Sequence, residues 1–125
     1  MDSETGRLAD AEIEALLNAL PGDITFAGKD DTILYYNRSR SPLFGRTQAI
    51  LGTSVQSCHP EKSVARVKQV LDGLKSGARD VDESWADLGG KLVRIRYFAV
   101  RSASGEYLGC LEFADDVTAA RSRKP

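Results

Sequence analysis

The chain has 125 residues, and its 17 Lys and Arg residues nearly balance its 18 Asp and Glu residues, for a formal net charge of −1 at pH 7. Hydrophobic residues make up 42% and charged residues 28% of the sequence, which is typical of one globular domain and excludes a disordered or fibrous chain. The near-neutral charge leaves no basic footprint for nucleic acid, and no apolar run approaches the roughly 20 residues that cross a bilayer. We therefore expect a cytoplasmic protein that binds neither nucleic acid nor membrane.

Residues 8–20 predict an amphipathic helix, for which Asp10 is a candidate N-cap and Pro21 marks the end. Its apolar stripe at helical spacing consists of Ile13, Leu16, Leu17 and Leu20. A helix that precedes the rest of the domain covers only part of it, and an exposed stripe favours pairing with a second copy. We predict a homodimer formed through these four side chains.

Residues 23–27 and 32–36 predict a hairpin of two strands, because both segments are rich in β-branched and aromatic residues. Between residues 37 and 52, helix-start signals alternate with glycines, which predicts two short helices.

A longer helix is predicted over residues 60–76, with Gly77 as its C-terminal cap. Its buried stripe consists of Val64, Val67, Val70, Leu71 and Leu74. The basic residues off this stripe are expected to face solvent; they are Lys62, Arg66, Lys68 and Lys75.

Residues 81–88, 91–101 and 107–117 predict three strands joined by short turns that contain glycine, and so an antiparallel meander. Together the elements indicate an α+β domain, in which helices cover one face of a five-stranded antiparallel sheet.

Alternation along the last two strands predicts which side chains face the core. Burying two unpaired arginines is costly, so Arg94 and Arg96 should point outward. The inward face of that strand then carries Val93, Ile95 and Tyr97. In the last strand we expect Leu111 and Phe113 to point inward and Glu112 outward, a parity that a bulge would reverse.

Sequence motifs of the common enzyme classes are missing. One His and two Cys cannot supply a four-ligand zinc site, and no nucleophile elbow or phosphate-binding loop occurs. His59 is the only general base that the sequence suggests, and no carboxylate is expected to point inward. We therefore expect that the protein is not an enzyme.

Several segments, in order along the chain, resemble the PAS sensory-domain superfamily. Residues 24–37 resemble its opening hairpin, and residues 43–52 its short-helix segment. Residues 59–61, His-Pro-Glu, resemble the step that opens its long helix, while residues 105–109 and Asp-Val-Thr at 116–118 resemble its closing hairpin and exit.

This resemblance implies a PAS-like sheet in the order 2-1-5-4-3, with the strands numbered along the chain. It divides the chain into an N-terminal amphipathic helix (1–22), a PAS domain (23–120) and a frayed tail (121–125).

A narrower resemblance connects the chain to PAS domains found at the C-terminus of bacterial hemerythrin-like regulatory proteins. The segments that carry it are residues 16–26, 58–64, 88–91 and 95–101. One His cannot supply a di-iron four-helix bundle, so the chain is expected to be a free-standing PAS protein or a fragment.

The resemblance implies a sensory or regulatory module that holds a small apolar ligand or cofactor between the long helix and the sheet. Such a module signals through a dimer or a partner protein. The predicted pocket residues are Val64, Val67, Leu71, Val93, Ile95, Tyr97, Leu111 and Phe113. Two alternatives stay open: a structural interaction module whose own side chains fill the cavity, and a small enzyme that uses the cavity.

Cys58 and His59 lie where the chain enters the long helix, beside the mouth of such a pocket. Thiolate and imidazole are common axial ligands of heme iron, so heme is one cofactor that they could hold. The simpler interpretation is structural, with His59 as a helix-entry residue and Cys58 as a small buried hydrophobe. A flavin is not expected, because Cys58 does not lie in the Asn-Cys-Arg-Phe-type segment of the flavin-binding relatives.

Overall fold

The computed structural model describes residues 1–121, with the side chains of all of these except residues 58, 120 and 121. Its helices are α1 (Asp10–Ala19), α2 (Glu61–Ser76) and α3 (Thr118–Arg121), together with the 3-10 helices η1 (Gln48–Ile50) and η2 (Val55–Cys58). The strands of its main sheet are β3 (Asp23–Gly28), β4 (Ile33–Tyr36), β5 (Val81–Leu88), β6 (Lys91–Arg101) and β7 (Tyr107–Asp116). A short strand pair, β1 (Asp2–Ser3) and β2 (Gly6–Arg7), precedes α1.

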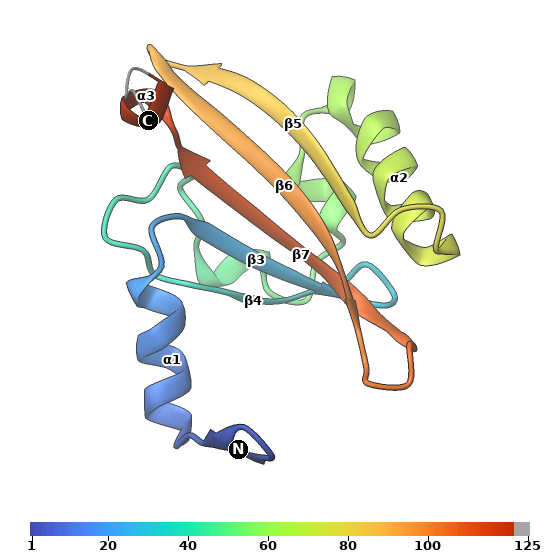
Figure 1. The fold of residues 1–125 in the computed structure, drawn as a ribbon. Coiled ribbons are helices and arrows are strands. Elements are labelled where there is room, and N and C mark those ends of the chain that lie inside the picture. The colour runs from blue at the N-terminus through green and yellow to red at the C-terminus, as the bar shows by residue number, and fades with distance from the viewer. Residues whose placement is uncertain (122–125) are drawn as a thin grey trace.

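The main sheet is antiparallel and has the order β4-β3-β7-β6-β5, which confirms the predicted order and the α+β class. The last strand, β7, lies in the middle, between the opening hairpin and the β5–β6 hairpin, and α2 covers one face of the sheet (Figure 1). We call this the inner face. In the described part of the chain, no helix is long and apolar enough to cross a membrane.

The core lies between α2 and the inner face. Val67, Val70, Leu71 and Leu74 of α2 are buried, as predicted, whereas Val64 is only half-buried. They pack against buried side chains of the sheet, namely Ala27, Ile33, Tyr97 and Cys110. The helix ends as expected at Gly77, whose φ of 81° is readily adopted by glycine.

Strand β7 has the opposite phase to the one predicted. Tyr97 is buried on the inner face, and Glu112 lies directly opposite it across the β6–β7 pair. Glu112 therefore points inward. Leu111 lies opposite Phe98, and both it and Phe113 point to the outer face. The predicted orientations of Leu111, Phe113 and Glu112 are wrong.

Strand β7 also contains a bulge and makes a close contact with β3. The β6–β7 register shifts between Val100 and Arg101, which leaves Leu108 as an extra residue in β7. Next to it, a Cβ on Gly109 would lie 2.2 Å from the carbonyl oxygen of Ala27, so only glycine fits there.

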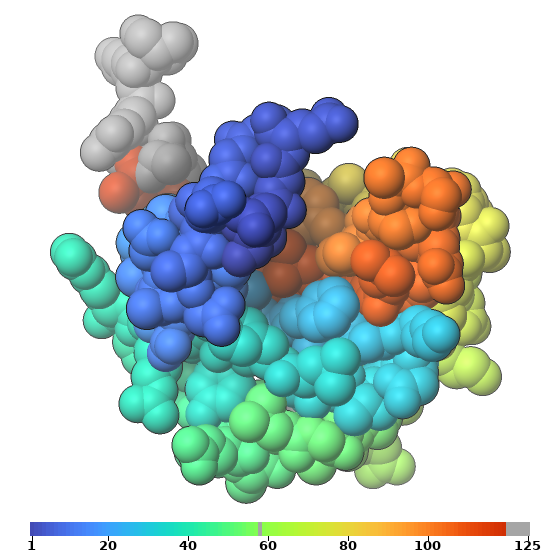
Figure 2. Space-filling model, turned by 90° about the horizontal axis from the view of Figure 1, so that it is seen from below, coloured from blue at the N-terminus to red at the C-terminus, as the bar shows by residue number. Residues whose placement is uncertain are grey.

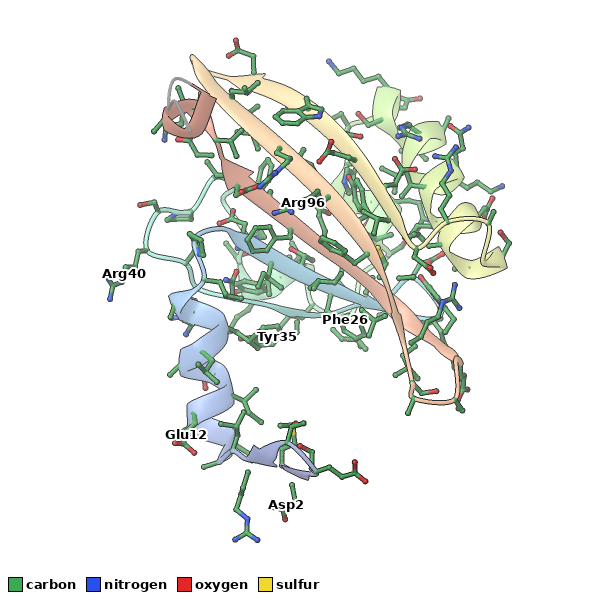
Figure 3. All side chains as sticks on the ribbon, viewed as in Figure 1. Asp2, Glu12, Phe26, Tyr35, Arg40 and Arg96 are labelled. Carbon is green, nitrogen blue, oxygen red and sulfur yellow. The ribbon has the colours of Figure 1, made fainter. Side chains whose placement is uncertain are left out.

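The outer face accommodates large apolar side chains because arginine covers them. The Arg96 guanidinium stacks 5.3 Å from the ring centre of Phe113 and 5.7 Å from that of Phe98. Figure 3 shows Arg96 and Phe26 on this side of the sheet, away from α2. The predicted outward orientation of Arg94 and Arg96 is confirmed, and Val93 is fully buried on the inner side.

Residues 37–47 form no helix, so of the two short helices predicted between 37 and 52 only η1 is present. The buried carboxylate of Asp23 organises this loop instead. It accepts hydrogen bonds from the backbone amides of Leu43 and Phe44, both at 3.0 Å, and from Ser39 Oγ at 2.7 Å. Backbone amides bound to a side chain are withdrawn from helical pairing, which is the physical reason for the difference.

Helix α1 stands out from the body of the domain (Figures 1 and 2). Leu16 is 54% and Leu20 41% exposed, and no residue of α1 is buried. Ala9, not Asp10, is the N-cap, and its backbone N–H donates to Glu12 Oε1 at 2.8 Å. At the other end of the chain, Arg121 closes α3, and the rest of the predicted frayed tail lies outside the described residues.

Candidate functional site

A small enclosed cavity lies between α2 and the inner face of the sheet. Its volume is about 10 Å³, which is the space of one water molecule. Its lining residues are Thr25, Ala27, Val55, Val67, Val70, Leu71, Tyr97, Cys110 and Glu112.

Three of the predicted pocket residues, Val67, Leu71 and Tyr97, line this cavity. Val64, Val93 and Ile95 do not line it, although they lie on the helix and on the inner face. Leu111 and Phe113 lie on the other side of the sheet. The alternation of β6 therefore identifies the inner face, of which only Tyr97 reaches the cavity, whereas the β7 pattern selects two residues of the outer face.

Glu112 is the polar group of this cavity that the sequence reasoning missed. Its side chain is 17% exposed, and His59 Nε2 lies 4.0 Å from its Oε2. Burial raises the pKa of Glu112, and the nearby charges of His59 and Arg46 oppose this increase. The one available signal was the position of Glu112 in register with Tyr97, which requires knowledge of the strand pairing.

His59 is held in a defined orientation at the rim of the cavity. Its Nδ1 lies 2.9 Å from the carbonyl oxygen of Val55. A carbonyl oxygen only accepts hydrogen bonds, so Nδ1 carries the hydrogen. In the neutral imidazole, Nε2 is then an acceptor that faces Glu112, and a proton on it would complete an ion pair with Glu112.

The thiol of Cys110 forms an unreactive part of the wall. Cys110 is buried, and burial raises the pKa of its thiol to about 12. A protonated thiol in apolar surroundings behaves as a small hydrophobe. Burial likewise raises the pKa of Tyr97.

The residues at the rim do not fit heme. A cavity with the volume of one water molecule has no room for a porphyrin, and His59 is already bound through Nδ1 and faces a carboxyl group. His59 is the C-cap of η2, and its N–H donates to the Gln56 carbonyl at 3.3 Å, in agreement with the structural interpretation. The side chain of Cys58 lies outside the described residues.

Ion pairs hold α2 against the edges of the cavity wall. Arg66 Nη2 lies 2.8 Å from Asp82 Oδ1 on β5, and Lys75 Nζ lies 2.7 Å from Asp31 Oδ2. These two basic residues are therefore paired rather than simply solvated. Burial acts to raise the pKa of Asp82, but the Glu83 amide and the arginines outweigh it and hold that pKa below its ordinary value.

A second depression, of about 580 Å³, is open and lies outside the core, between the end of β4 and η1. Its buried cation, Arg46, stacks on Tyr36 and donates to Ile24 O, to Thr25 Oγ1 at 2.9 Å and to Asn37 O at 3.1 Å. Arg46 therefore serves the loop, and the enclosed cavity is the better candidate site.

Asn37 connects this region to α1. Its side chain is buried, with Oδ1 accepting from Ile24 N at 2.7 Å. Its Nδ2 donates to Leu17 O at 2.9 Å and to Gly22 O at 3.1 Å. Asn37 is thus the link between α1, β3 and the end of β4.

Comparison with known proteins agrees with this geometry. The PAS domain family model matches residues 13–118. A crystal structure described as a C-terminal domain from Streptococcus mutans is 36% identical, with a TM-score of 0.89, and covers 97% of this chain and 94% of its own. Two more distant structures share the fold. The PAS domain of Bordetella pertussis BvgS is 20% identical, with a TM-score of 0.66, and the match covers 85% of this chain and 84% of that one. A sensory box sensor histidine kinase from Vibrio cholerae is 16% identical, with a TM-score of 0.61, and the match covers 85% of this chain and 89% of that one.

A comparison with curated proteins found no match. The family match spans most of the chain, and the sheet order and the helix-covered face are those that a PAS domain requires. The chain belongs to the PAS domain family.

Proposed function

We propose that the protein is a sensory module, without catalytic activity of its own, that binds a small and largely apolar ligand between α2 and the sheet. The observation that carries the proposal is the enclosed cavity, which has valine and leucine walls and one carboxyl group, Glu112. A core needs no buried carboxyl group for packing, and burial of one is unfavourable. Sensor kinases among the structural neighbours support a sensory function.

A ligand larger than one water molecule can enter only if α2 moves. Such a movement would strain the Arg66–Asp82 and Lys75–Asp31 pairs, which join the helix to the rest of the domain. The bound and free states would then differ in the position of α2, and the ligand would shift the balance between them.

The proposed output is a homodimer formed through the exposed stripe of α1, Ile13, Leu16, Leu17 and Leu20. Asn37 binds the α1 backbone directly, so a displacement of the opening hairpin would reach this stripe. A structural neighbour, Vibrio cholerae VqmA, is described as a dimer with a large conformational shift. A partner protein is the proposed recipient of the signal.

The small cavity volume favours a second function, that of a structural module whose own side chains fill the core. In that case the domain would only dimerise or bind a partner. The resemblance to PAS domains of hemerythrin-like regulators stays a prediction, and the Streptococcus mutans relative is described as a C-terminal domain.

Native mass spectrometry and absorbance of the purified protein test the ligand proposal. A retained mass that is released on unfolding, or a mass added from a library of small apolar compounds, would support it. An unshifted mass throughout such a screen, in the intact and folded protein, would favour the structural module.

A further inference from the structure

We infer that the cavity selects a small, largely apolar molecule that presents an N–H or O–H donor to Glu112. This rests on the proposed ligand-binding function and names the class of ligand for that same cavity.

The first observation is that the carboxyl group is unused. In the part of the chain that the structure describes, no hydrogen bond reaches the Glu112 carboxyl group, and its contact with His59 Nε2, at 4.0 Å, is too long to be one. Glu112 is 17% exposed, and an acceptor that is largely withdrawn from water without a donor is unfavourable by itself and gains from a ligand that supplies the donor. Glu112 is therefore the group that a ligand can satisfy.

The second observation is the position of His59 beside it. Because Nδ1 is bound to the Val55 carbonyl, the neutral ring presents Nε2 toward Glu112 as a second acceptor. Two acceptors 4.0 Å apart can both lie about 2.8 Å from a single nitrogen or oxygen placed off the line between them. The pair thus suits a donor group rather than another acceptor.

Acidic ligands are disfavoured by the same surroundings. Glu112 itself repels an anion, and Asp23 adds a second negative group near it. The nearby cation, Arg46, already donates to Ile24, Thr25 and Asn37 and lies 3.5 Å from Asp23.

The other side chains around the cavity determine the polarity of the rest of the ligand. Val55, Val67, Val70 and Leu71 face the cavity from η2 and α2, and Ala27 and Cys110 face it from the sheet. These six side chains offer apolar contact, and the hydroxyl-bearing residues Thr25 and Tyr97 complete the wall. A compact ring that carries one N–H or O–H group meets both requirements.

Indole and benzofuran form a matched pair of probes, because they have nearly the same shape and differ in whether N–H or oxygen occupies the ring. Both are titrated into the intact protein while amide resonances of the cavity residues are recorded by NMR. Because the free cavity is so small, the same titrations are run in Leu71→Ala, which enlarges it. A single well-placed hydrogen bond to a charged group should make indole bind about tenfold or more tighter than benzofuran.

Glu112→Gln tests the acceptor, and Glu106→Gln, in the exposed turn between β6 and β7, is the matched control. Glu112→Gln should reduce the preference for indole to about twofold or less, while Glu106→Gln leaves it unchanged. Unfolding curves of each variant check that the domain is folded.

Equal binding of the two probes would overturn the inference and leave the proposed function standing, because the cavity would then bind ligands without selecting a donor. A preference for indole that survives Glu112→Gln would also overturn it. Failure of both probes to bind even in Leu71→Ala would overturn it as well, whereas the proposed function is judged separately by native mass spectrometry.

Discussion

The side-chain amide of Asn37 donates to the backbone carbonyl of Leu17 at 2.9 Å, and so joins the end of β4 to the last turn of α1. The carbonyls in the last turn of a helix have no partner within the helix, so a buried side chain can bind one of them. Because α1 has no buried residue, this contact is a principal support for its position on the domain.

Replacing Asn37 with Ala should lower the free energy of unfolding by about 2–4 kcal/mol, because it leaves the amide of Ile24 and the carbonyls of Leu17 and Gly22 without their hydrogen bonds. Urea unfolding followed by circular dichroism measures the change. Asn18→Ala is the control, since Asn18 accepts one exposed bond from Arg38 N, and it should cost less than about 1 kcal/mol. Equal effects of the two variants would contradict the central position given to Asn37.

The dimer prediction is tested by placing charges on the exposed stripe. Leu16→Glu combined with Leu20→Glu should yield a folded monomer, because both side chains are exposed in the single chain and neither supports its core. Sedimentation velocity at high micromolar concentration gives the oligomeric state. Ala15→Glu, on the opposite side of α1, is the matched control and should stay dimeric. A monomeric wild-type protein would end the proposal.

The sequence predicted the sheet well because its strands are long, alternate clearly and are separated by glycine turns. In β6, arginines at 94 and 96 leave only one face that can be buried, and that face is the observed one. In β7 both faces carry apolar residues, so alternation alone does not decide between them. The bulge at Leu108 and the arginine that covers Phe113 are tertiary features, and no local pattern contains them.

The candidate site was harder to predict for the same reason. Periodicity predicts Tyr97 and Leu71, but the alternation of Leu111 and Phe113 assigns Glu112 to solvent, where carboxylates are usually found. A charged residue that violates this rule marks a place where packing alone does not explain the sequence. Likewise, the loop at 37–47 depends on Asp23, a residue far from it in the sequence.

Hemin tests the conclusion that the residues at the edge of the cavity, Cys58 and His59, do not hold heme. Because the cavity has no room for a porphyrin, we expect that hemin titration gives no Soret band that depends on His59. Absorbance spectra of the wild type, His59→Ala and Cys58→Ser decide this. A band that shifts or disappears in either variant would show that the residue ligates iron and that the domain opens far more than we propose.

The Asp82 ion pairs should contribute to stability above acidic pH. The pKa of Asp82 is lower in the folded protein than its ordinary value, so the unfolded chain binds more protons and stability is lost as the pH falls through the folded-state pKa. Asp82→Asn should therefore destabilise the protein at neutral pH by about 1–3 kcal/mol, and the difference from wild type should shrink in acid. Urea unfolding of both proteins at several pH values measures this difference in the free energy of unfolding. A difference that does not change with pH would contradict the lowered pKa of Asp82 in the folded protein. Asp87→Asn, on an exposed part of β5, is the control.

Glu112 should show the opposite pH dependence. Burial raises its pKa in the folded protein above the ordinary value of 4.5, while His59 and Arg46 oppose this rise and Asp23 adds to it. Between pH 4.5 and this raised pKa the folded protein binds the proton more tightly than the unfolded chain does, so the contribution of Glu112 to stability falls as the pH rises through its folded-state pKa. Glu112→Gln cannot ionise, and so its free energy of unfolding should increase relative to wild type between acidic and neutral pH. Glu106→Gln, which is exposed, should follow the wild-type curve throughout. If Glu112→Gln and wild type stay parallel over this range, the carboxyl group is already ionised in the folded protein, as in a formed ion pair with His59.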